Sequence, residues 1–216
     1  MRFAISRGLT IAIFGLLLVG MLGWPAPTKA QLGAPTVPPA GTTTPPTTGT
    51  TTTTLADTGT LAAGTSDALQ ASAIAGNIPA ALLAGDALHA TTIGYLNQFD
   101  SEAAVSDLTV GAAGATIAAD FVMARASEVL GTAGTSSAEV DNLSINGVPV
   151  VVTGAPNQTI SVPGGTVTLN ELQTLPDGTI VVNALHIAIP GVEDVVFASA
   201  TAGASGGRAT AVQASY

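Results

Sequence analysis

The sequence contains no cysteine, and its only lysine is Lys29. Without cysteine there are no disulfides and no thiolate metal sites, so stability must come from a packed core. Aromatic residues are only 4% of the chain, which argues against a strong glycan site, because such sites usually present aromatic rings. After residue 30 the only cations are Arg125 and Arg208, against 14 carboxylates, a formal charge of −12. This charge disfavours nucleic acid and anionic lipid as partners.

The one long apolar run lies near the N-terminus. Two arginines precede the run from Leu9 to Val19, and prolines and then small residues follow it. This order is typical of a signal peptide over residues 1–30, cleaved between Ala30 and Gln31. An uncleaved membrane anchor is the alternative, because extension to Trp24 brings the run close to the roughly 20 residues that cross a bilayer. We therefore expect a secreted protein, extracellular or at the cell surface, with no membrane contact after cleavage.

Residues 31–60 are predicted to be a disordered linker. Within them, residues 33–54 hold 11 threonines and five prolines and carry no charge. Such a segment buries too little apolar area to offset the entropy of ordering it. Its threonines are either O-glycosylated or unmodified. At the other end, residues 203–216 are expected to be a flexible C-terminal tail.

Strand patterns dominate residues 61–202, which are poor in the long charged residues that surface helices use. Alternation of apolar and polar residues predicts a hairpin over 159–170. Asn146-Gly147 predicts a two-residue hairpin turn. The strand that follows this turn contains Pro149, which predicts that it lies at a sheet edge. The expected fold is all-β, a mostly antiparallel β-sandwich built from hairpins, with further strands at 179–189 and 192–200.

Two alternatives stay open for this fold. A six-residue pattern recurs at positions 105, 140 and 182. It consists of Val, two small or polar residues, Leu, a polar residue and a β-branched residue. The unequal spacing of this repeat leaves an irregular β-solenoid as one alternative. Residues 112–130 fit an alanine-rich helix as well as a strand, because both periodicities bury Ile117 and Phe121.

Four motifs follow one another in the C-terminal half: Asn-Leu-Ser-Ile-Asn-Gly-Val-Pro-Val at 142–150, Gly-Thr-Val-Thr-Leu-Asn-Glu at 165–171, Val-Asn-Ala-Leu-His-Ile at 182–187 and Asp-Val-Val-Phe-Ala-Ser-Ala at 194–200. In this order they resemble the choice-of-anchor P family of bacterial exported proteins, over roughly 61–202. The resemblance implies an exported, largely β domain of the cell envelope or medium, and it brings no established catalytic residues. The residues that carry it are Asn142, Leu143, Asn146, Gly147, Thr168, Leu169, Asn170, Glu171, Asn183, Ala184, Leu185 and His186.

His89 and His186 are the only histidines. As metal ligands they would have to meet carboxylates such as Asp86 or Glu171, and neither HxH nor HExxH spacing is present. A hydrogen-bonded structural role or a surface position is therefore expected for both. Gly-x-Ser-x-Gly is also absent, so the sequence specifies no Ser-His-Asp triad and no catalytic residue.

Two pairs of neighbouring acids, Asp100/Glu102 and Glu193/Asp194, are interpreted as solvated acids that flank turns. Calcium binding is the alternative, although no twelve-residue calcium loop is present; no other cofactor is expected. Arg125 is expected to pair with a carboxylate.

The expected role is a secreted or surface-displayed, non-enzymatic structural or adhesive module of the bacterial cell envelope. Its partner would be an envelope or extracellular protein or glycan, or a second copy that pairs with an edge strand at Val148–Val152 or with the C-terminal tail. A secreted hydrolase with an unrecognised site is one alternative, which a histidine close to both a serine and an acid would favour. A calcium-stabilised adhesin is the other.

Overall fold

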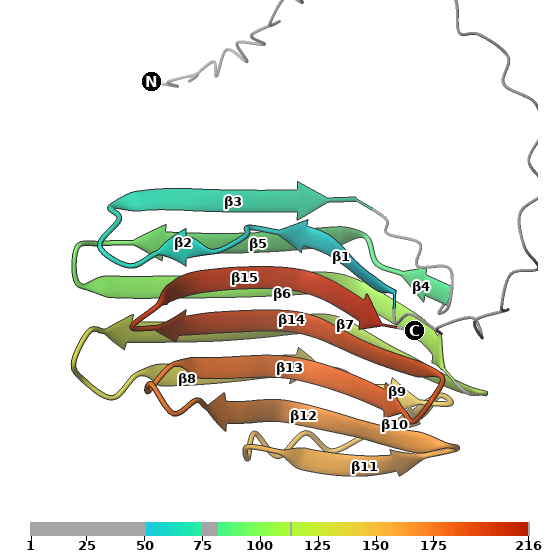
Figure 1. Ribbon diagram of the computed structural model, residues 1–216. Coiled ribbons are helices and arrows are strands. Elements are labelled where there is room, and N and C mark those ends of the chain that lie inside the picture. The colour runs from blue at the N-terminus through green and yellow to red at the C-terminus, as the bar shows by residue number, and fades with distance from the viewer. Residues whose placement is uncertain (1–50, 75–81, 113, 216) are drawn as a thin grey trace, which may run out of the picture. The chain divides into compact units, whose positions relative to one another are not determined.

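Antiparallel strands arranged in two packed sheets form the fold in the computed structural model (Figure 1). The structure describes residues 51–74, 82–112 and 114–215. Within these ranges every element is a strand, so there is no helix that could cross a membrane. The predicted all-β sandwich is confirmed. The signal peptide, its cleavage site at Ala30 and Gln31, and residues 31–50 lie outside the described residues.

The first sheet, which we call the C-terminal sheet, has seven strands in the order β1-β15-β14-β13-β12-β11, with β2 also paired to β15. Each strand pair is antiparallel. The first described strand, β1, therefore lies beside the last, β15. The strands are β1 (Thr52–Asp57), β2 (Leu61–Ala62), β11 (Gln158–Val162), β12 (Gly165–Thr174), β13 (Ile180–Ile189), β14 (Glu193–Gly203) and β15 (Gly206–Ser215).

The second sheet, the N-terminal sheet, has eight strands in the order β10-β9-β7-β6-β5-β3; β4 also pairs with β6, and β8 with β7. Its centre is a long hairpin of β6 and β7, each of 15 residues. The strands are β3 (Asp67–Ala73), β4 (Leu82–Ala84), β5 (Ala87–Gly94), β6 (Gln98–Ala112), β7 (Ala115–Val129), β8 (Thr135–Asp141), β9 (Ser144–Ile145) and β10 (Val148–Pro149).

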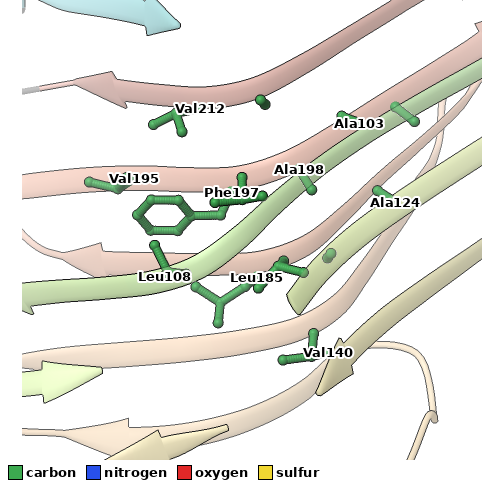
Figure 2. Close-up of a cluster of buried hydrophobic side chains, with 14 of the residues drawn as sticks. Ala103, Leu108, Ala124, Val140, Leu185, Val195, Phe197, Ala198 and Val212 are labelled. Atoms are coloured by element: carbon green, nitrogen blue, oxygen red, sulfur yellow. The ribbon is translucent and has the colours of Figure 1, made fainter. Parts of the chain in front are cut away.

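The core lies between the two sheets and is built from a few large side chains set among alanines. Phe197 of β14 is fully buried, and Figure 2 shows its ring among Leu108, Leu185 and Val195. Small residues lie in register across the inner face of the N-terminal sheet, and they leave room for the large side chains of the facing sheet. This row consists of Ala71, Ala90, Ala103, Ala124 and Ala138.

A line of irregular residues crosses the C-terminal sheet. Ala56, Asn170 and Ala198 have positive φ, at 47°, 48° and 54°, and lie on β1, β12 and β14. Each interrupts the alternation of its strand, so that Phe197 and Ala198 are both buried although they are neighbours in the chain. A positive φ is uncommon for alanine. On the two sides of this line, the alternation of inward-facing and outward-facing side chains is offset by one residue.

Several predictions of local structure are confirmed. The hairpin predicted over 159–170 is formed by β11 and β12. Asn146 and Gly147 form the predicted turn with φ of 52° and 74°, and β10, which contains Pro149, ends its sheet. The helix alternative for residues 112–130 is wrong, because β7 occupies most of that segment and pairs along its whole length with β6.

Two predicted boundaries are wrong. The expected flexible tail at 203–216 contains β15, which pairs with β14 on one side and with β1 and β2 on the other. Its alanines looked uninformative, yet Ala209, Ala211 and Ala214 are fully buried between the sheets. The expected linker also extends too far, because its threonines, which are good strand formers, begin β1 at Thr52.

Candidate functional site

A cluster of four polar side chains lies on the outer face of the C-terminal sheet. His186 of β13 lies between Glu171 of β12 and Asp194 of β14, because antiparallel pairing brings these three strands into register. The His186 Nδ1 is 3.0 Å from Glu171 Oε2, and its Nε2 is 3.1 Å from Asp194 Oδ1. Asn183 Nδ2 donates to the same Glu171 oxygen at 2.7 Å. We call these residues the acid-histidine cluster.

The surroundings of His186 favour its charged form. The hydrogen bond to Glu171 raises the pKa of His186; burial opposes this rise, and the negative charges of Glu171 and Asp194 add to it. The same hydrogen bond lowers the pKa of Glu171, against burial and with help from Asn183. The imidazolium can donate one hydrogen bond to each carboxylate. The cluster therefore ties three neighbouring strands together.

The acid-histidine cluster does not converge on one point, as metal ligands must. Its two carboxylates lie at opposite edges of the ring, and both ring nitrogens are engaged. In the described part of the chain, no group of three or more His, Asp or Glu side chains is arranged to hold a metal ion.

His89 lies on the outer face of the other sheet, so the two histidines do not meet. Its Nδ1 is 3.1 Å from Ser72 Oγ, and its Nε2 is 2.8 Å from Thr91 Oγ1. Neither histidine contacts both a serine and an acid among the described residues. That arrangement was the one that would favour a hydrolase.

A cavity of about 530 Å³ opens on the outer face of the N-terminal sheet. Across it Arg125 Nε donates to Glu102 Oε2 at 2.5 Å, so Arg125 has the carboxylate partner expected for it. Asp100 accepts from Gln98 Nε2 at 3.0 Å. The lining is mostly short and hydroxyl-bearing: Thr91, Ile93, Asp100, Ser101, Glu102, Arg125, Ala126, Ser127, Thr135, Ser136 and Ser137.

The interpretation of the acidic pairs as turn acids needs correction. Asp100 and Glu102 lie within β6, two residues apart, and so project from the same face of one long strand. Glu193 is buried, and burial raises its pKa. Asp194 belongs to the acid-histidine cluster. Glu193 and Asp194 begin β14 directly after a turn, inside the strand predicted over 192–200, so the sequence pattern located this pair but did not show that Glu193 is buried.

The motif residues behind the family resemblance divide by position. Asn142, Asn146 and Asn170 have positive φ, and their side chains bond to Asp120, to the Thr116 N–H and to the Gly154 carbonyl. Thr168 lies opposite His186 on the outer face, and Glu171, Asn183 and His186 form the acid-histidine cluster. The remaining motif residues with large or small apolar side chains are buried: Leu143, Leu169, Ala184 and Leu185.

Sequence reasoning missed the contact between the first and last strands. Asp57 accepts hydrogen bonds from Arg208 Nε at 2.9 Å and Arg208 Nη2 at 2.5 Å. Thr210 and the Gly59 N–H also donate to this carboxylate. Both ends of this contact lay in segments predicted to be flexible, so no signal connected them.

Comparison of the chain with protein-family models, with curated proteins and with solved structures finds no match. The choice-of-anchor P resemblance therefore stays a prediction.

Proposed function

We propose that the protein is an exported, non-enzymatic structural or adhesive module of a bacterial cell envelope, secreted or displayed at the cell surface. The observation that carries this proposal is the outer face of the C-terminal sheet. There, side chains that are polar except for Val196 lie in register across successive strands, on a scaffold that is fixed by the core beneath. One row runs through Thr54, Gln213, Val196, His186, Thr168 and Thr159, and the next through Asp57, Thr210, Ser199, Asn183 and Glu171. We call this face the polar array.

The polar array offers a partner many donors and acceptors over a broad surface. Neighbouring strands are about 4.8 Å apart, so the array repeats at a regular interval. A shallow cavity of about 240 Å³ lies within it, between Asn183, Val196 and Gln213. The short hydroxyl side chains that form much of the array lose little entropy when they bind. These properties suit an extended, repetitive envelope partner.

The acid-histidine cluster supports the non-enzymatic part of the proposal. A histidine that activates a nucleophile needs one nitrogen facing that nucleophile. In His186 both nitrogens already face carboxylates. The cluster thus serves to hold the polar array in register.

The test is binding of the purified chain 31–216 to isolated envelope fractions. A bulky cation in the middle of the polar array, Val196→Arg, should weaken binding at least tenfold. The matched control, Val148→Arg, changes an exposed valine on the other sheet and should bind like the unmodified chain. Thermal melts of both variants establish that they are folded. No saturable binding by the unmodified chain, or equal binding by the two variants, would contradict the proposal.

A further inference from the structure

In the described part of the chain seven strands pair on one side only: β1, β2 and β11 in the C-terminal sheet, and β3, β4, β8 and β10 in the N-terminal sheet. Of these, β2 and β4 have only two and three residues. An unprotected edge carries free backbone N–H and C=O groups that can pair with another strand, and proteins usually block such edges. These edges differ in how far they are blocked.

The edge predicted from the sequence, Val148–Val152, is closed. β10 has only two residues and includes Pro149. Beyond it the Gln158 side chain occupies the backbone: its Nε2 donates to the Val151 carbonyl, and its Oε1 accepts from the Thr153 N–H, both at 2.8 Å. The C-terminal tail, the other predicted edge, lies inside its sheet as β15.

The edges of the C-terminal sheet are also interrupted. Ala56 breaks the extended conformation of β1 with its positive φ. β11 has five residues, and Pro163 follows directly. A proline and an irregular residue both limit the length over which a new strand can pair.

β3 has none of these protections. Its seven residues, Asp67 to Ala73, include no proline, no positive φ and a single charge. It pairs with β5 on one side and with no other strand in the described residues. Leu69 and Ala71, on its inner face, are only partly buried. β8 (Thr135–Asp141) is equally long and also pairs on one side only, with β7, but it carries two charges, Glu139 and Asp141, and charged side chains protect an edge. Of the long and regular open edges of the described sandwich, β3 is therefore the less charged.

We infer that β3 pairs with β3 of a second copy of this chain, antiparallel and about a two-fold axis at Gln70. This register places Asp67 opposite Ala73 of the second copy and joins the two N-terminal sheets into one. Gln70 faces its own counterpart, and the remaining opposed residues are small or apolar. A two-fold interface of this kind is self-complementary by symmetry.

Charge repulsion between the two β3 strands does not prevent this register, and no pair of opposite charges stabilises it. The two Asp67 carboxylates lie six residues apart along the joined strands, about 20 Å, which exceeds the screening length of about 8 Å in physiological salt. The large negative charge of each copy opposes association at low salt. The dimer should therefore strengthen as salt is added. This inference concerns self-association and does not depend on envelope binding.

The test is sedimentation velocity on chain 31–216 over a range of concentrations, in about 0.15 M salt. The unmodified chain should shift from monomer to dimer as its concentration rises. Gln70→Lys and Gln70→Glu should each weaken the dimer at least tenfold, because like charges then lie directly opposite each other. An equal mixture of the two variants should restore a dimer that contains one copy of each. The matched control, Gln213→Lys, places the same charge on the exposed outer face of β15 and should dimerise normally.

Three results would overturn the inference: a chain that stays monomeric at every concentration, a Gln70→Lys variant that dimerises like the unmodified chain, or a mixture that forms no mixed dimer. The thermal melt of each variant shows whether a monomer results from misfolding. In that case the mixture of Gln70→Lys and Gln70→Glu decides whether β3 forms the interface, since only folded β3 edges can restore pairing.

Discussion

Replacing Asp57 with asparagine should destabilise the folded chain by about 2 kcal/mol, because this carboxylate joins the first described strand to the last. Asp57 accepts two hydrogen bonds from Arg208, one from Thr210 and one from the Gly59 N–H. Asparagine keeps the shape of the side chain but loses the charge and one acceptor oxygen. Arg208 is then left without its carboxylate partner.

The size of the effect follows from the exposure of the two side chains. Asp57 is 21% exposed and Arg208 41% exposed. Fully exposed ion pairs contribute about 0.2–1 kcal/mol, and a hydrogen bond to a charged group contributes about 1.5–3 kcal/mol. A two-point contact at intermediate exposure lies between these limits, at about 2 kcal/mol. For a domain of this size that corresponds to a fall in Tm of about 4–8 °C.

The effect should depend on pH in a defined direction. Burial acts to raise the pKa of Asp57, but the hydrogen bonds from Arg208 and the Gly59 N–H, with the charge of Arg208, lower it below its ordinary value of 3.8. A carboxyl with a lowered pKa in the folded state stabilises the fold above its unfolded pKa and loses that contribution as pH falls through the folded one. The difference between Asp57→Asn and the unmodified chain should therefore be full at pH 7 and vanish in strong acid.

Urea denaturation of chain 31–216 and of Asp57→Asn at pH 7 measures the difference directly. Glu102→Gln is the matched control, because Glu102 and Arg125 form an ion pair whose side chains are 37% and 56% exposed. This control should cost less than about 1 kcal/mol. If Asp57→Asn were no more damaging than Glu102→Gln, the argument that the contact between β1 and β15 stabilises the fold would be wrong.

Three further predictions concern the interior and the polar array. His186→Gln should lower the free energy of unfolding, measured in urea, by about 1 kcal/mol below pH 6.5. The raised pKa of His186 gives the fold a stabilisation that is lost as pH rises through the pKa of the folded state, so the effect of the substitution should shrink at higher pH. A pH-independent difference would count against the charged cluster. Gly203→Ala should cost about 2–3 kcal/mol, since a Cβ there would lie 2.7 Å from the Thr179 Cα, whereas Gly111→Ala meets nothing within 4 Å and should be nearly neutral in the same melts. Glu128→Gln should raise Tm at pH 7, because burial and then the charge of Asp177 raise the pKa of Glu128, so its ionisation above pH 4.5 costs stability; an unchanged or lower Tm would refute this.

Local turn chemistry explains why the hairpins of the C-terminal half were predictable. The Asn146-Gly147 turn and the hairpin over 159–170 each join strands that are neighbours in the chain. β1 and β15 were missed because their pairing joins Thr52 to Ser215, at opposite ends of the described chain. Neither strand has a pattern strong enough to be recognised alone. Only the contact between them shows that both belong to the sheet.

The candidate site was partly predictable for a related reason. Glu171 and His186 stood out as motif residues, but nothing in the sequence placed Asp194 beside them. Their meeting depends on the pairing of β12, β13 and β14, whose register is constant, and on the change in which side chains face outward at the line through Asn170 and Ala198, where φ is positive. An alanine carries no sequence signal for that conformation, since glycine or asparagine usually occupies it. The phase of the outer face beyond this point was therefore not predictable.

The central claim is that this chain is an exported module whose folded part acts outside the cell. Surface labelling of intact producing cells, combined with the mass of the chain recovered from the medium and envelope, tests it most directly. We predict a chain that begins at Gln31, or an intact one held in the membrane by its N-terminal segment, accessible to label without lysis. A full-length chain that begins at Met1 and becomes accessible only after lysis would contradict the claim.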